Sequence, residues 1–254
     1  MARAPLIGYR AIPIDECHDP LVAIPQSCFS FTTPHAYVAL EAPYGNTSPW
    51  MLRSKVLNAL LAAQAELNQR KPGWRLKLFD AYRPIPVQAF MVWREFRLQA
   101  ERVGRSLSSF HDPDALKAGD SALYELLASR VFEFWGVPSH DPRTPPPHAT
   151  GAAIDLTLQD ESGQEIDMGC PVDETTARAY PDHYKDALSP ETHAFHAHRV
   201  LLNDVMAAAG FIRHGNEWWH FSIGDQMWAW RQKKPVAIYG SAAWLPISSC
   251  TAGR

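Results

Sequence analysis

The sequence predicts an α+β fold: a single compact domain over residues 1–254, with a central, mainly antiparallel sheet flanked by helices. Segments of helical period and segments of alternating period both occur, without the regular strand–helix alternation that builds a parallel sheet. The length suits one large domain or two small ones, and no repeat or low-complexity linker divides the chain. Nine tryptophans and 21 prolines indicate an aromatic-rich core and many ordered loops.

Four segments have the apolar periodicity of helices, and their ranges are 54–71, 87–104, 121–136 and 191–210. In the first helix, Ser54 is the expected N-cap. Its apolar stripe consists of Val56, Leu60, Ala63 and Leu67. Pro86 allows the second helix to begin, and Gly210 is the expected C-cap of the last.

Three segments alternate like strands, and their ranges are 74–82, 152–158 and 211–224. The pair Arg83-Pro84 ends the first of them. The second leads into a hairpin candidate at DESGQ, residues 160–164, and the third is expected to turn at residues 214–216. Proline-rich residues 138–150 and polar residues 160–190 are predicted to form loops.

Asp155 is an unusual residue within its strand. The alternation places Ile154, Leu156 and Leu158 on one face, and Asp155 with Thr157 on the other. For a lone aspartate, a solvent-facing position is the ordinary interpretation. A functional interpretation requires histidines and a further acid elsewhere in the chain at suitable spacing.

Such partners are present: His148 lies seven residues before Asp155, and the segment NEWWHFS contains Glu217 and His220. A catalytic zinc usually has three protein ligands and one open position for water. His148, Asp155 and His220 would form such a set, with Glu217 as a free carboxylate able to take a proton from the water. In a regular strand, however, residues 217 and 220 face opposite sides. Their side chains converge only if a bulge or turn intervenes, or if Glu217 precedes the strand.

The segment FDAYRP, residues 79–84, adds a third group of polar residues. Asp80 shares its parity with Leu76 and Leu78, so it leans toward the buried face, where an unpaired carboxylate is costly. The Arg83 guanidinium at the following turn could stabilise an oxyanion. A structural Asp80–Arg83 pair that fixes the turn is an equally good interpretation of this segment.

Taken together, these segments resemble the zinc D-alanyl-D-alanine dipeptidases, metallopeptidases of the vancomycin-resistance type. The matching segments are DAYRP, HATGAAIDLTL, DMG at 167–169 and EWWHF, with LLNDVMAAAGF before the last of them. The resemblance covers about residues 50–230. We expect the remaining N- and C-terminal extensions to be packed or partly flexible.

The resemblance implies one zinc ion per chain, bound by His148, Asp155 and His220. It implies that Glu217 acts as general base and then as general acid, and that Arg83 steadies the tetrahedral intermediate. The expected activity is hydrolysis of a short D-amino-acid dipeptide, D-Ala-D-Ala above all, with Asp80 as a candidate contact for the substrate ammonium. The implied fold is the compact α+β fold of zinc D,D-carboxypeptidases and hedgehog domains.

Two departures from the family pattern bear on how the ends of the substrate are held. Pro146 occupies the position of a serine, and Thr150 that of an arginine, in the best-known members. These departures leave the metal site intact and affect how strict the dipeptide preference is. The alternative functions are a zinc D,D-carboxypeptidase or endopeptidase acting on cell-wall peptide stems, or a non-catalytic zinc-binding module of the same fold. Glu217 argues against the last, because a structural zinc needs no free base. Salvage, wall turnover and resistance all remain open as physiological roles.

The composition excludes several other classes of protein. A net charge of −3 gives no broad electrostatic reason to bind nucleic acid or an anionic membrane, so neither is expected as a partner. No run approaches the ~20 apolar residues of a membrane span. The cysteines are scattered, without a C-x-x-C pair, so neither a disulfide framework nor a thiolate zinc site is expected.

The N-terminal residues lack the apolar segment of a secretory signal. We therefore expect a cytoplasmic protein, with a periplasmic or secreted chain that has lost its signal as the alternative. The sequence gives no indication of the oligomeric state. His193, His196 and His198 fall on the predicted fourth helix, where ordinary structural roles are favoured over metal binding, and no role is assigned to His183 or His214.

Overall fold

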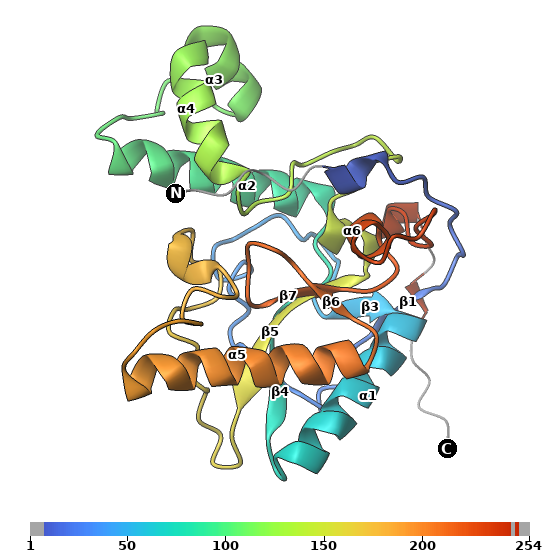
Figure 1. Ribbon diagram of the computed structural model, residues 1–254. Helices are drawn as coiled ribbons and strands as arrows, with labels where there is room; N and C mark the ends of the chain where they lie inside the picture. Colours follow the sequence, from blue (N-terminus) through green and yellow to red (C-terminus); the bar gives the residue numbers. More distant parts are fainter. Residues whose placement is uncertain (1–7, 245–246, 249–254) are drawn as a thin grey trace.

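A five-stranded sheet lies at the centre of the computed structural model, which describes residues 8–244 and 247–248 (Figure 1). The strand order is β2-β4-β5-β7-β6. The strands are β2 (Ser30–Phe31), β4 (Arg75–Asp80), β5 (Ala153–Gln159), β7 (His220–Ser222) and β6 (Ile212–Arg213). Only the β2–β4 pairing is parallel, and the other three are antiparallel. The predicted α+β class with a mainly antiparallel sheet is confirmed.

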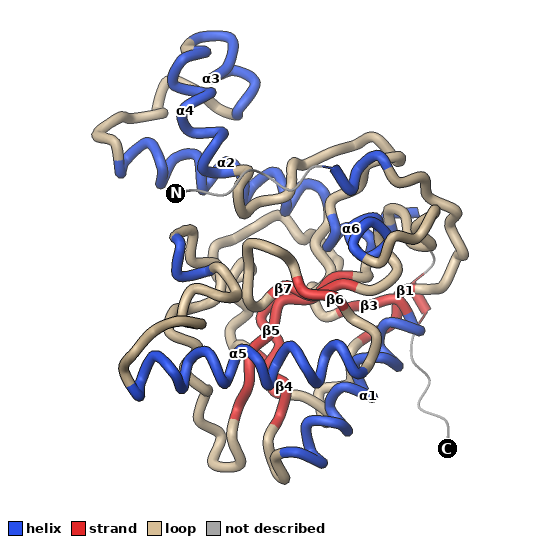
Figure 2. The backbone as a smooth tube through the Cα atoms, in the orientation of Figure 1, coloured by secondary structure: helices blue, strands red, loops and turns tan. Residues whose placement is uncertain are grey.

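Two long helices, α1 (Ser54–Arg70) and α5 (Pro190–Ala208), cover one face of this sheet (Figure 2). Their apolar residues form one buried cluster with Ile154, Leu156 and Leu158 of β5. The alternation in β5 therefore predicted its core-facing side correctly. Asp155 and Thr157 point to the opposite face, which is buried as well rather than solvent-exposed.

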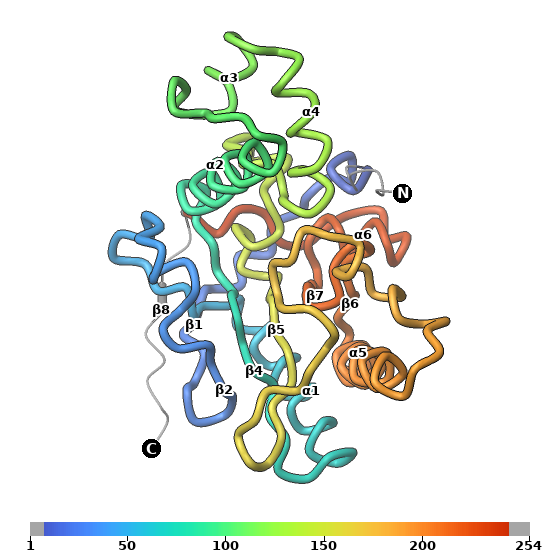
Figure 3. Tube along the Cα trace, turned by 90° about the vertical axis from the view of Figure 1, so that its left-hand side faces the viewer, coloured from blue at the N-terminus to red at the C-terminus, as the bar shows by residue number. Residues whose placement is uncertain are grey.

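A second apolar cluster lies beyond one end of the sheet, where α2 (Ile85–Arg102), α3 (Pro113–Gly119) and α4 (Ser121–Val131) pack together (Figure 3). Helix α3 was not predicted from the sequence, and α4 is shorter than the predicted range 121–136. The helix ends at Val131 because the chain turns there, carrying Glu133 and Trp135 toward the pocket described below.

The N-terminal region adds a short 3-10 helix, η1 (Gly8–Ala11), and a three-stranded sheet of order β3-β1-β8. Its strands are β1 (Leu21–Ala23), β3 (Met51–Arg53) and β8 (Ile247–Ser248). The remaining elements are α6 (Gln226–Arg231) and the 3-10 helices η2 (Pro147–Thr150), η3 (Ala177–Ala179) and η4 (Ala242–Trp244).

Two predicted helix caps differ in detail. Ser54 is the first helical residue of α1 rather than its N-cap, and its backbone N–H donates to the carbonyl of Pro20 at 2.9 Å. The N-cap is Arg53, whose side chain is engaged elsewhere. At the end of α5 the C-cap is Ala209, and Gly210 follows in the left-handed region at φ +92°.

Both predicted turns occur where the sequence indicated them. After β5, the chain reverses at residues 160–164, and the N–H of Ile166 returns to the carbonyl of Leu158 at 2.9 Å. β6 and β7 pair on either side of residues 214–216. The cysteines of the described region, Cys17, Cys28 and Cys170, are free, while Cys250 and the first seven residues lie outside it. No helix among the described residues is long and apolar enough to cross a membrane.

Arg53 connects the N-terminal region to the rest of the molecule. Its guanidinium is fully buried and lies against both carboxylate oxygens of Glu16, each at 2.9 Å. It also donates to the carbonyls of Asp19, Thr150 and Gly240 at 2.7–3.0 Å. One side chain thereby fixes segments from the start, middle and end of the chain.

Replacing Arg53 with methionine should lower the free energy of unfolding by about 3 kcal/mol, because it leaves a carboxylate and three buried carbonyls without their donor. Urea denaturation measures the change. Arg70→Met is the matched control, since Arg70 forms a partly exposed pair with Glu66 on α1 and should cost less than about 1 kcal/mol. Equal stability of the two variants would contradict this role for Arg53.

Candidate active site

His148 lies in η2, immediately before a tight backbone turn. Gly151 takes a left-handed conformation at φ +69°, and a Cβ there would lie 2.4 Å from Leu21, so the turn requires glycine. The Nδ1 atom of His148 lies 2.7 Å from the carbonyl oxygen of Ala81. Because a carbonyl only accepts, Nδ1 carries the proton and donates, and in the neutral ring Nε2 then presents its lone pair to the pocket.

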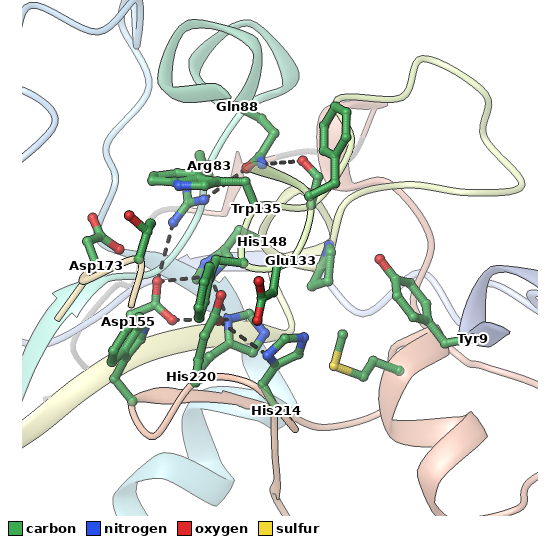
Figure 4. Close-up of a pocket in the computed structure, with 18 residues that line it drawn as sticks. Tyr9, Arg83, Gln88, Glu133, Trp135, His148, Asp155, Asp173, His214 and His220 are labelled. Carbon is green, nitrogen blue, oxygen red and sulfur yellow. Dashed lines mark hydrogen bonds and ion pairs between the residues drawn. The ribbon is translucent and has the colours of Figure 1, made fainter. Parts of the chain in front are cut away.

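Strand register brings the other polar residues together. Asp155 of β5 is paired with Asp80 of β4 on one side and with His220 of β7 on the other. The Oδ1 atom of Asp155 lies 3.0 Å from Nδ1 of His220, and its Oδ2 lies 3.2 Å from Nε2 of His148. The two imidazole nitrogens are 3.1 Å apart (Figure 4).

This donor set fits a divalent metal ion. The ligand atoms of His148, Asp155 and His220 lie within 4.8 Å of one another, and all three residues are buried. Lone pairs and a carboxylate converging on one point repel each other unless a cation lies between them.

Within the described chain, this is the one group of three or more such side chains close enough to share an ion. His193, His196 and His198 of α5 form no comparable set. His198 is half-buried, and its Nδ1 lies 2.7 Å from the carbonyl of Asp167.

Glu217 lies in the irregular segment between β6 and β7, so the strand parity that separated it from His220 does not apply. Its Oε2 lies 3.7 Å from Nδ1 of His220 and 3.6 Å from Nδ1 of His214. Burial and the nearby charge of Asp155 raise the pKa of Glu217 well above its ordinary value. A carboxyl group of this kind can accept and return a proton near neutral pH.

Arg83 lines the pocket and also contacts Asp80. Its Nε donates to Asp80 at 2.9 Å, and its other nitrogens donate to Gln88 at 2.9 Å and to the hydroxyl of Tyr37 at 3.1 Å. One terminal nitrogen lies 3.3 Å from Oδ2 of Asp155. The two sequence-based interpretations of Arg83 are therefore compatible, because one guanidinium contacts the turn residue Asp80 and also faces the candidate metal ligands.

Asp80 itself lies beneath the pocket rather than in its wall. It is fully buried, and besides Arg83 its carboxylate contacts His35 at 3.0 Å and the hydroxyl of Tyr44 at 3.2 Å. Occupied on every side, this carboxylate has no position left for a substrate ammonium. Its observed contacts orient Arg83 instead.

Asp173 is an acidic residue of the pocket wall that the sequence did not single out. It lies in the loop after the DMG segment, in the left-handed region at φ +66°, and accepts a hydrogen bond from Tyr37 at 2.7 Å. Burial, reinforced by Asp155, raises the pKa of Asp173 to about 7. The quoted DMG segment lies only four residues upstream, but no periodicity marks Asp173 itself.

The pocket has a volume of about 60 Å³. In Figure 4, Asp173 lies at one end and Tyr9 at the other, with His148, Asp155 and His220 between them. The other labelled residues of the wall are Arg83, Gln88, Glu133, Trp135 and His214, and of these only Arg83 was predicted from the sequence.

Comparison with known proteins extends over most of the chain. Residues 32–236 match the model of the Peptidase M15 family, described as D-ala-D-ala dipeptidase. A D-alanyl-D-alanine dipeptidase of Synechocystis sp. is 42% identical over 250 residues, which cover 93% of this chain and 97% of that protein. Proteins of the same name from Escherichia coli and Enterococcus faecalis are 42% identical over 76 residues (30% of this chain, 37% of that protein) and 25% identical over 170 residues (66% and 71%).

Replacing His148 with alanine should abolish stoichiometric binding of a divalent metal, because two remaining ligands hold such an ion far more weakly than three. Elemental analysis of the purified variant measures the metal content. His183→Ala removes an exposed histidine distant from the ligand set and should retain the metal. Full metal content in the His148 variant would refute the assigned ligand set.

Proposed function

The chain belongs to the Peptidase M15 family of D-ala-D-ala dipeptidases, and on that premise we propose that it is a zinc-dependent dipeptidase that hydrolyses D-Ala-D-Ala. The observation that carries the proposal is the convergence of His148, Asp155 and His220 beside the free carboxylate of Glu217. Two imidazoles and one carboxylate are a ligand set typical of catalytic zinc, with a coordination position left open.

Zinc held by these residues would supply a Lewis acid and a water molecule of lowered pKa. Glu217 takes the proton of the attacking water and delivers it to the leaving amine. Its raised pKa suits both steps, because a carboxyl group of ordinary acidity would hold the proton too weakly to return it.

Arg83 has two assigned roles in this mechanism. It orients Asp155 through the contact at 3.3 Å, and its positive charge stabilises the oxyanion that develops on the scissile carbonyl. Asp80 holds the guanidinium in place from below. We assign Asp173 to binding the substrate ammonium. Burial raises the pKa of this carboxyl group, and a cation beside it would lower that pKa again, so the ionised carboxylate would pair with the ammonium.

The small volume of the pocket favours a dipeptidase over the two alternatives. A peptidase that acts on long cell-wall stems needs a cleft open at one end at least, whereas this cavity is small and bounded by Asp173 and Tyr9. A non-catalytic zinc module has no use for a buried carboxyl group of raised pKa beside the ligands. We also propose that residues 1–254 form a single peptidase domain.

The purified, zinc-loaded protein should hydrolyse D-Ala-D-Ala in preference to L-Ala-D-Ala and to a stem pentapeptide. Release of D-alanine measures each rate. Glu217→Ala serves as the matched inactive control: it should retain zinc but lose roughly 10²–10⁴-fold in kcat, the usual contribution of a general base. Preference for the pentapeptide would favour the carboxypeptidase alternative, and loss of zinc from the Glu217 variant would make that residue a ligand.

Arg83→Lys should lower kcat by about 10²–10³-fold, with a smaller effect on KM, because lysine keeps the charge but loses the forked geometry that meets an oxyanion. Steady-state kinetics and the melting temperature are measured on the same preparation. A variant with a lowered melting temperature and unchanged kcat would remove Arg83 from the catalytic residues and leave it the structural role alone.

A further inference from the structure

Tyr9 lies outside the region that matches the family model, yet it lines the pocket that holds the candidate metal ligands. The match begins at residue 32, whereas Tyr9 belongs to η1 near the N-terminus and is only 6% exposed. The N-terminal extension thus contributes a side chain to the pocket wall.

The backbone around Tyr9 is held from two sides. The Arg10 guanidinium donates to the carbonyl and hydroxyl oxygens of Thr144 at 3.2 and 3.1 Å. The side-chain amide of Gln226 donates to the carbonyl of Ile12 at 2.6 Å. Gln226 begins α6, which follows closely after β7 and its ligand His220. The position of Tyr9 is therefore coupled to the metal site through the fold.

Among the residues that the structure describes, none occupies the hydroxyl group of Tyr9. Across residues 8–244 of the structure, no side chain or carbonyl forms a hydrogen bond with it. Burial raises the pKa of Tyr9 to about 12, so the group stays protonated and available as a donor. Pro147, which lines the pocket too, has no N–H to offer.

The proton transfer to the leaving amine indicates which part of the substrate lies at the Tyr9 end of the pocket. Glu217 protonates the leaving amine, so the C-terminal residue of the dipeptide lies on the Glu217 side of the scissile bond. The Oε2 atom of Glu217 lies 3.6 Å from Nδ1 of His214, which lies on the Tyr9 side of the candidate ligands, whereas Asp173 lies at the opposite end (Figure 4). The free carboxylate is two bonds from the leaving nitrogen and points away from the metal ligands.

We propose that the Tyr9 hydroxyl donates a hydrogen bond to the C-terminal carboxylate of the bound dipeptide, and that its ring closes this end of the pocket. The proposal rests on the proposed dipeptidase function and names the residue that restricts it to short substrates. The N-terminal extension is then part of the substrate-binding site rather than an appendage.

Tyr9→Phe, which removes the hydroxyl and keeps the ring, separates these two roles. We expect kcat/KM for D-Ala-D-Ala to fall about tenfold or more, mainly through KM, as for loss of a hydrogen bond to a charged group. With D-alanyl-D-alaninamide, which lacks the carboxylate charge, the fall should be about threefold or less. Tyr124→Phe is the matched control, because Tyr124 lies on α4 and stacks on Phe96, and it should leave both values unchanged.

Equal losses for the acid and the amide, or no loss for either, would overturn the carboxylate contact. Tyr9→Ala tests the ring: activity on D-Ala-D-Ala-Gly relative to D-Ala-D-Ala should rise, and an unchanged ratio would overturn the closure. Melting temperatures of both variants identify any loss of fold. A wild-type protein inactive on D-Ala-D-Ala would refute the proposed function and this contact with it, whereas an active wild type with an unaffected Tyr9→Phe variant refutes the contact alone.

Discussion

The register of three adjacent strands determines the geometry of the candidate site. Asp80, Asp155 and His220 lie side by side because β4 and β7 both pair with β5 at this level. That register is specified on the other face, where the apolar side chains of β5 pack against α1 and α5. A shift of one residue would turn Asp155 into the core and Ile154 into the pocket, so the energetics of the core select the arrangement of the ligands.

Two buried arginines, Arg53 and Arg199, fix loops that have no strand pairing of their own. Arg53 binds the carbonyl of Thr150 and so fixes the end of the loop that carries His148. Arg199 of α5 is fully buried and donates to the carbonyls of Met168, Arg178 and Tyr180, which lie around the loop that contains Asp173. A guanidinium with several fixed donors suits this task, because each irregular segment leaves carbonyls that need partners inside the protein.

Much of the ligand set was predictable because it lies on or beside regular structure. The period of β5 distinguished Asp155 from its apolar neighbours, and the expected hairpin placed His220 on the next strand. The metal-binding and catalytic roles came from resemblance to a family and are still proposals. Asp173 and Tyr9 escaped prediction because loop conformation and long-range packing place them, and neither leaves a local periodicity. The position of Glu217 in the irregular segment before β7 likewise depends on where β7 begins.

The contacts of Arg53 have a consequence for the synthesis of the protein. This side chain binds Glu16 near the start of the chain and the carbonyl of Gly240 near its end. Pairings of such large sequence separation form slowly, and this one has to wait until residue 240 has left the ribosome. Arg53 also binds the carbonyl of Thr150, so the loop that carries His148 gains its full set of supporting contacts only once the segment around Gly240 has folded against it.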